Sequence, residues 1–156
     1  MKILKFGGTS LGSADTIRIV RNILEKEESN CAVVVSAFAG VTDQIIRTAE
    51  RASVQDGSWK EAYASLRERH LDVARELLDG TEEEAAVKEL GSLLDEFREI
   101  LEGVSSLRDL SPKTLDLLLS FGERLSARLV ARFVYGATYV DARKLIRTNS
   151  DFGQAT

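Results

Sequence analysis

The sequence predicts an α/β fold with a mainly parallel central sheet and a long helical insertion. Two apolar stretches, residues 3–6 and 31–36, flank an amphipathic segment, which is the pattern of a strand–helix–strand unit with parallel strands. Farther along, residues 59–77 and 87–101 carry apolar side chains at helical spacing, which is typical of a helical hairpin. The chain has 156 residues and 44% hydrophobic residues, enough to bury the core of one domain.

The first strand is expected to end at a glycine pair, Gly7 and Gly8. Ser13 and Asp15 then start a helix, because a hydroxyl and a carboxylate both suit the positive end of a helix. The second strand, residues 31–36, is apolar without alternation, so both of its faces are expected to be covered. A further helix follows it.

The predicted insertion spans about residues 58–103 and consists of two helices of about 20 residues each. Gly80 is expected to stop the first helix, and Thr81 with Glu84 to form a capping box for the second. Next, Ser111 and a proline predict the start of another long helix, which continues to Gly136. A third short strand is expected at residues 138–140.

Composition excludes several classes of function. The net charge is −4 with both signs mixed along the helices, so neither a nucleic acid nor a membrane is expected as a partner. Cys31 is the only cysteine, which excludes an internal disulfide, and we interpret it as a buried hydrophobe. His70 is the only histidine and falls on an apolar stripe, so we expect packing, with no metal site. No signal peptide is evident, and a cytoplasmic protein is expected.

Residues 5–10 (Lys-Phe-Gly-Gly-Thr-Ser) are a candidate anion site. They combine a strand end, a glycine turn that permits positive φ and close backbone approach, two hydroxyls, and the cation of Lys5. Phosphate is the first ligand to consider, since backbone N–H groups and a lysine together suit it. A tight strand-to-helix turn with a solvated lysine remains an equal alternative.

Three further polar residues stand where a substrate could bind. Ser36 ends the second predicted strand and Thr42 starts the following helix, and ligands of open α/β sheets bind at the carboxyl ends of strands. Thr42 could instead be only a helix N-cap. Glu123 follows Gly122 within a helix, and the missing side chain there would let a small molecule approach the carboxylate. The alternative is a surface glutamate beside two arginines.

Three stretches together resemble the aspartokinases of the amino-acid kinase superfamily: residues 5–10, residues 121–126 (Phe-Gly-Glu-Arg-Leu-Ser) and residues 140–149. The loop with Ser36 and Thr42 is similar to the second loop of that family. The resemblance covers essentially the whole chain. It implies a three-layer α/β/α amino-acid kinase-like fold, of which these residues would form the N-terminal portion.

The resemblance also implies roles for individual residues. Lys5, as the catalytic residue, would contact the phosphoryl group in transfer, with Phe6, Gly7 and Gly8 as the phosphate-binding segment. The amino-acid substrate and its α-ammonium would be held by residues from three segments: Ser36, Thr42 and Glu123. ATP and Mg²⁺ would be the cofactors, and L-aspartate would be phosphorylated on its side-chain carboxylate, the first step of aspartate-family amino-acid biosynthesis. That carboxylate is ionised at neutral pH and needs no general base.

Aspartokinases are far longer than 156 residues. The resemblance therefore places the adenine pocket and regulatory domains outside this chain, as in a truncated piece or gene fragment, and predicts no turnover by this piece alone. The unpaired sheet edge predicts a homo-oligomer or a covering C-terminal half. Two other functions stay open: a kinase for another carboxylate, such as glutamate or N-acetylglutamate, and a non-catalytic binding or assembly module.

Overall fold

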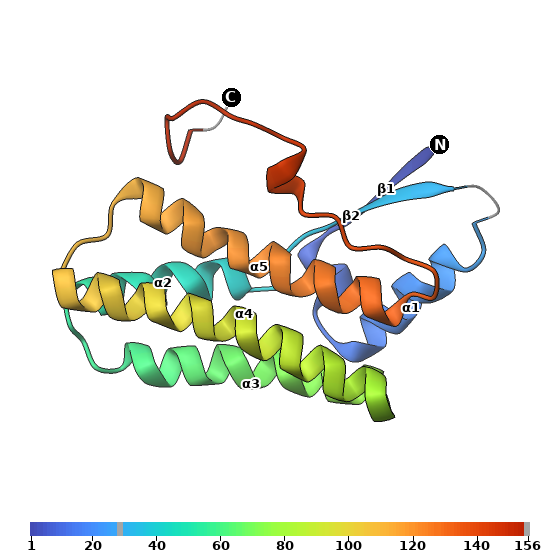
Figure 1. Cartoon of the computed structure of the whole chain (residues 1–156), viewed down its shortest axis with the longest axis horizontal. Coiled ribbons are helices and arrows are strands. Elements are labelled where there is room, and N and C mark those ends of the chain that lie inside the picture. Colours follow the sequence, from blue (N-terminus) through green and yellow to red (C-terminus); the bar gives the residue numbers. More distant parts are fainter. Residues whose placement is uncertain (28–29, 155–156) are drawn as a thin grey trace.

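The computed structural model describes residues 1–27 and 30–154 of the chain. Its two strands, β1 (Lys2–Phe6) and β2 (Cys31–Val35), pair in parallel, and α1 (Ala14–Leu24) joins them (Figure 1). The predicted strand–helix–strand unit is therefore confirmed. Within the described residues the sheet has only these two strands, so β2 keeps one edge without a strand partner.

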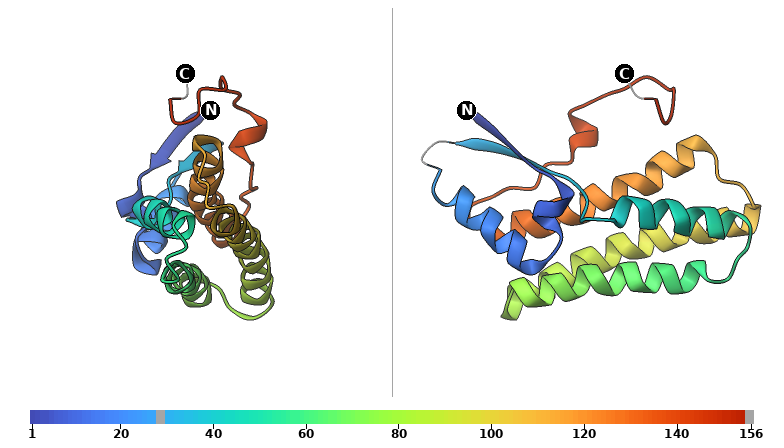
Figure 2. Two further views of the ribbon diagram at one scale, coloured as in Figure 1. Left: turned by 90° about the vertical axis from the view of Figure 1, so that its left-hand side faces the viewer. Right: turned by 180° about the vertical axis from the view of Figure 1, so that it is seen from behind.

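Four longer helices form the rest of the fold: α2 (Val41–Ser53), α3 (Trp59–Leu77), α4 (Gly80–Leu107) and α5 (Pro112–Phe133). They run side by side as a bundle, with α1 and the strands at one end (Figure 2). Each of α2 to α5 packs against the other helices of the bundle, which therefore holds most of the apolar core. Among the described helices, none combines the length and the apolar character needed to cross a membrane.

Local sequence signals explain where two of the helices start. Ser13 caps α1: its hydroxyl accepts a hydrogen bond from the Thr16 N–H at 3.3 Å, and the Thr16 hydroxyl accepts one from the Ser13 N–H at 3.1 Å. Ser111 caps α5 in the same way, accepting from the Thr114 N–H at 3.1 Å. Both starts agree with the sequence-based prediction, since serine hydroxyls satisfy N–H groups that have no partner inside the helix.

The start of α4 differs from the prediction. Thr81 and Glu84 were expected to form a capping box, but the helix already begins at Gly80, with Asp79 at the cap and no side-chain cap bond. Thr81 therefore lies in the first turn and not at the cap position. Gly80 has a positive φ of 59°, which lets the chain turn from the extended end of α3 directly into α4.

The hairpin of α3 and α4 is held by aromatic side chains. Phe97 of α4 lies between Tyr63 of α3 and Phe121 of α5, with ring centroids 6.2 Å and 5.3 Å away. All three rings are buried, and such ring pairs add to the free energy gained from burial. The two helices of the predicted hairpin are confirmed. Its interpretation as an insertion over residues 58–103 stays a prediction.

The predicted strand at residues 138–140 is wrong. A strand needs a neighbouring backbone to pair with, and neither β1 nor β2 pairs with this segment. Side chains hold the segment instead: the Arg128 guanidinium donates to the Tyr139 hydroxyl at 3.0 Å and lies 4.3 Å from the centre of its ring. A short 3₁₀ turn, η2 (Ala142–Lys144), follows.

Candidate functional site

Both strands end at the same edge of the sheet. Phe6 lies opposite Val35, and the Ser36 N–H extends the pairing by donating to the Phe6 carbonyl at 3.1 Å. The two loops that follow, η1 (Gly8–Leu11) and residues 36–40, therefore start side by side. This carboxyl edge is where open α/β sheets bind ligands.

Gly8 is needed because the two loops touch. A Cβ at Gly8 would lie 3.0 Å from the Ala37 carbonyl oxygen, a contact that only a residue without a side chain avoids. At Gly7 a Cβ would have no neighbour within 4 Å, so this backbone faces open space. The glycine turn permits positive φ but does not use it, since φ is −78° at Gly7 and is not positive at Gly8. The missing side chains matter instead because they let the second loop come close to Gly8 and leave the backbone of Gly7 open.

The second loop turns sharply into α2. Gly40 has a φ of 77° and occupies the cap position of the helix, without a side-chain cap bond. Thr42 is therefore the second residue of α2, which excludes the alternative in which it serves as the N-cap. Its side chain is exposed, and within the described residues no hydrogen bond to its hydroxyl is present. The Thr42 hydroxyl is free for a ligand.

The middle of α5 docks onto the same loop. The Glu123 carboxylate accepts a hydrogen bond from the Ala37 N–H at 3.4 Å, and the Ser126 hydroxyl donates to the Ser36 carbonyl at 2.7 Å. Gly122 permits this contact, because a Cβ there would lie 2.7 Å from the Ala37 Cβ. The space left by Gly122 is thus filled by Ala37 and is not open to a small molecule, which corrects the sequence-based interpretation.

Gly122→Ala is expected to lower the free energy of unfolding by about 1–3 kcal/mol, because the new methyl group overpacks the contact with Ala37. Gly103→Ala in α4 is the matched control. A Cβ at Gly103 meets nothing within 4 Å, so the substitution is expected to raise stability by about 0.5–1 kcal/mol. Urea unfolding measures both variants. A gain in stability for both would show that α5 does not approach the loop this closely.

Glu123 retains capacity for a ligand. The side chain is exposed, and only one of its oxygens is engaged, by the Ala37 N–H. The neighbouring arginines have other partners: Arg124 pairs with Glu96 at 3.2 Å and Arg128 with Glu89 at 3.1 Å. Glu123 is thus a surface residue beside two arginines, as in the alternative interpretation, but within the described residues it pairs with neither of them.

Lys5 lies one residue before the end of β1, opposite Val34. It is exposed, and the structure shows no ion pair or hydrogen bond from its ammonium to the residues it describes. The lysine at the other end of the strand, Lys2, pairs with Glu27 at 2.6 Å. Lys5 thus presents an unneutralised positive charge next to the site edge.

The structure brings Gly8, Ser36 and Glu123 together around Ala37 by direct contacts, with Thr42 just beyond the loop. Lys5 lies near this edge by its position on β1, and within the described residues its ammonium makes no hydrogen bond or ion pair. Sequence reasoning missed two residues that bind the loops. Ser126 could have been found by its i+3 spacing from Glu123, which puts both on one face of α5. The other, Arg69, gave no signal.

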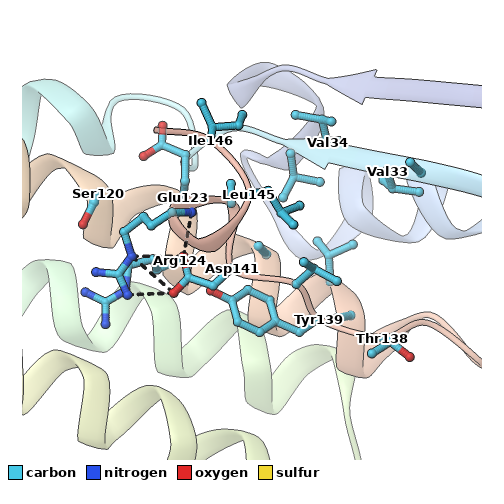
Figure 3. A pocket seen from close by; sticks show the side chains of 18 residues that line it. Val33, Val34, Ser120, Glu123, Arg124, Thr138, Tyr139, Asp141, Leu145 and Ile146 are labelled. Carbon is cyan, nitrogen blue, oxygen red and sulfur yellow. Dashed lines mark hydrogen bonds and ion pairs between the residues drawn. The ribbon is translucent and has the colours of Figure 1, made fainter. Parts of the chain in front are cut away.

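A mainly apolar cavity of about 610 Å³ adjoins the site (Figure 3). It lies between β2, α5 and the segment 138–146, and Val34, Tyr139 and Ile146 are among its lining residues. Glu123 stands at its rim, with its carboxylate pointing away from Arg124 and Asp141. The carboxylate is therefore not part of the charged cluster formed by Arg124, Asp141 and Arg143.

In that cluster the side chains of Asp141 and Arg143 form an ion pair. Their side chains join at 2.7 Å, and this hydrogen bonding lowers the pKa of Asp141 to about 2. Arg124 lies nearby with its side chain only 10% exposed, and burial together with the Arg143 charge lowers its pKa. The charges of Asp141 and Arg143 thus hold segment 141–143 together, and no hydrogen bond from them to the loop at Ala37 is present among the described residues.

The family model of the amino acid kinase family matches residues 1–153. The chain is 36% identical to an aspartokinase of Chlamydia trachomatis, over 98% of this chain and 33% of the relative. It is 32% identical to the chloroplastic aspartokinase 3 of Arabidopsis thaliana, over 98% of this chain and 28% of the relative. The chain therefore spans about a third of the length of these curated relatives.

Two solved structures of Escherichia coli aspartokinase III share the fold. The complex with aspartate and ADP has a TM-score of 0.89 at 28% identity, covering 99% of this chain and 34% of that chain. The complex with lysine and aspartate has a TM-score of 0.87 at 27% identity, covering 100% of this chain and 34% of that one. The amino-acid kinase-like fold expected from the sequence is thus confirmed.

Proposed function

The chain belongs to the amino acid kinase family, and on this premise we propose that it is the N-terminal part of an aspartate kinase. Such an enzyme transfers the γ-phosphoryl group of ATP to the side-chain carboxylate of L-aspartate, giving aspartyl phosphate. The curated relatives are aspartokinases, and a structural relative binds aspartate and ADP. The observation that carries the proposal is the convergence of Gly8, Ser36 and Glu123 on Ala37, near the end of β1 where Lys5 has no charged partner in the described part of the chain.

The phosphoryl group is assigned to the edge beyond β1. Lys5 supplies a positive charge without a partner in the described residues, and the open backbone of Gly7 lets a phosphate approach. A lysine and backbone N–H groups stabilise the charge that spreads over a phosphoryl group during transfer. Lys5 therefore acts by charge neutralisation, and Gly7 with Gly8 by positioning.

The amino acid is assigned to the second loop and α5. The free oxygen of Glu123 can bind an α-ammonium, and the hydroxyls of Ser36 and Thr42 can donate to carboxylate oxygens. The nucleophile is the substrate's own carboxylate, which is ionised at neutral pH. No histidine is needed, and His70, the only one in the sequence, is fully buried in the core.

We propose that Mg²⁺ enters with ATP and is held through the phosphates. The described residues contain no group of three His, Cys, Asp or Glu side chains that could hold a metal ion by themselves. Magnesium in kinase sites commonly keeps water and binds substrate phosphates with only one or two carboxylates. The ion would neutralise phosphate charge, while Lys5 and the glycine backbone orient the group.

A hydroxylamine trap tests the function. The longest product of the gene that carries this chain is incubated with ATP, Mg²⁺ and hydroxylamine, which converts an acyl phosphate into a hydroxamate that is detected as its coloured iron(III) complex. L-aspartate, L-glutamate and N-acetylglutamate are compared in parallel. We expect hydroxamate with L-aspartate. Product with another carboxylate only would instead assign a different kinase, and no product with any of them would favour a non-catalytic module.

Glu123→Gln is expected to weaken L-aspartate binding about ten- to a hundredfold and to leave ATP binding within about twofold, because the α-ammonium then faces a neutral amide in place of a carboxylate. Glutamine can still accept the Ala37 N–H, so the loop should stay in place. The control is Glu96→Gln on α4, which removes the carboxylate that pairs with Arg124 of α5. Calorimetric titrations give both affinities. Equal losses for the two ligands would mean that Glu123 has only a structural role.

A further inference from the structure

Arg69 of α3 reaches both loops of the proposed site. One guanidinium nitrogen donates to the Ala39 carbonyl at 2.9 Å, and another donates to the Gly12 carbonyl at 3.3 Å. Gly12 directly follows η1, the turn after β1, and Ala39 lies in the loop after β2. A single side chain of the helical hairpin thus joins two segments that belong to different strands.

These two loops also approach each other directly, at two places. A Cβ at Gly12 would lie 3.6 Å from the Ala39 Cβ, and one at Gly8 would lie 3.0 Å from the Ala37 carbonyl oxygen. The guanidinium is a rigid plane whose donors have a fixed spacing, so it sets the distance between the two carbonyl groups. A lysine ammonium has no such fork and cannot fix both acceptors in the same way.

Within the described residues no carboxylate pairs with Arg69, whereas two other arginines of α3 each pair with one. Arg67 pairs with Asp95 at 3.4 Å, and Arg75 pairs with Asp72 at 2.9 Å. For Arg69 the described residues offer two carbonyl groups and the Phe38 ring, whose centre is 6.0 Å away, but no carboxylate. Its positive charge therefore acts on the loops that are assigned to phosphoryl and aspartate binding.

We propose that Arg69 is a positioning residue, which holds the loops after β1 and β2 in register and so couples the α3–α4 hairpin to the site. Arg69 need not touch a substrate: it acts through the backbone at Gly12 and Ala39. The consequence for ligands rests on the proposed function. The link between the α3–α4 hairpin and the two loops does not rest on the proposed function, and it can be tested separately.

Amide hydrogen exchange tests the link on the chain itself. Two amides report on the loops: the Ser10 N–H, bonded to the Gly7 carbonyl at 3.0 Å, and the N–H of Val41 at the start of α2, bonded to the Phe38 carbonyl of the second loop at 3.0 Å. In Arg69→Lys we expect both amides to exchange about tenfold faster, the effect of losing about one hydrogen bond to a charged group, with exchange in α4 and α5 unchanged. Arg75→Lys on the same helix is the control and should change neither reporter.

Two results would overturn the proposal. Unchanged exchange at Ser10 and Val41 would show that Arg69 does not hold the loops, and an equal rise across α4 and α5 would show a general loss of stability. L-aspartate affinity, measured on the same variants, is expected to fall about tenfold in Arg69→Lys and to stay constant in Arg75→Lys. If the unmodified protein binds no aspartate, the proposed function fails, while the exchange result still decides whether Arg69 links the loops.

Discussion

Lys5→Ala is expected to lower the rate of aspartyl phosphate formation about 10²- to 10³-fold in the longest product of this gene. Removing one preorganised group that stabilises charge in the transition state commonly costs this much. The fold should survive, because the Lys5 side chain is exposed and makes no ion pair within the described residues. Hydroxamate formation under saturating ATP and L-aspartate gives the rate.

Lys2→Ala is the matched control for Lys5→Ala. Lys2 lies on the same strand and is also exposed, but its ammonium is paired with Glu27 at the opposite end from the site. We expect its rate to stay within about twofold of the unmodified protein, since exposed ion pairs contribute little. A near-normal rate in Lys5→Ala, or an equal loss in Lys2→Ala, would refute the role assigned to Lys5.

Acidification from about pH 7 to about pH 4 is expected to cost about 3 kcal/mol of folding free energy through His70 alone. The ring is fully buried, stacks on Phe38 at 4.7 Å, and its Nδ1 contacts the Leu66 carbonyl at 2.8 Å. A carbonyl only accepts, so Nδ1 carries the proton and Nε2 is bare. Among the described residues Nε2 has no hydrogen-bond partner.

The surroundings of His70 explain why acid lowers the free energy of unfolding. Burial lowers the pKa of His70 from 6.5 to about 4, and the charge of Arg69 acts in the same direction. Between these two values the unfolded chain takes up a proton that the folded protein does not. The stability contributed by the neutral histidine is therefore complete above about pH 6.5 and is lost as the pH falls toward 4.

His70→Phe isolates this effect. The phenyl ring preserves the stacking on Phe38 and cannot titrate, so its unfolding free energy should fall about 3 kcal/mol less over the same pH range. Carboxylates elsewhere contribute equally to both proteins and cancel in the comparison. Urea unfolding at several pH values gives the two curves, and parallel curves would contradict a buried, neutral His70.

Local features were predictable from the sequence because they depend on neighbouring residues. The strand–helix–strand unit follows from apolar runs, and the starts of α1 and α5 follow from Ser13 and Ser111, which bond to N–H groups three residues away. The positions of the site loops follow from the rule that parallel strands end at one edge. These signals need no knowledge of how distant helices pack.

Features that depend on distant contacts were not predictable. Arg69 bonds to residues 30 and 57 positions away, and this depends on how the hairpin docks against the strands. Gly122 was interpreted as an opening, but the approach of Ala37 fills it. The strand expected at residues 138–140 has suitable side chains but lacks a pairing partner. In each case the sequence specifies the chemical group, and tertiary packing decides its use.

We propose that loops from two strands and the middle of α5 form one binding site for an amino acid. The most direct measurement is an NMR titration of the chain with L-aspartate, with potassium acetate at matched ionic strength as the control. We predict that the amide signals of Ser36, Thr42 and Glu123 shift together along one binding curve. Shifts confined to the apolar cavity around Val34 and Ile146, or no shifts beyond those in acetate, would contradict the claim.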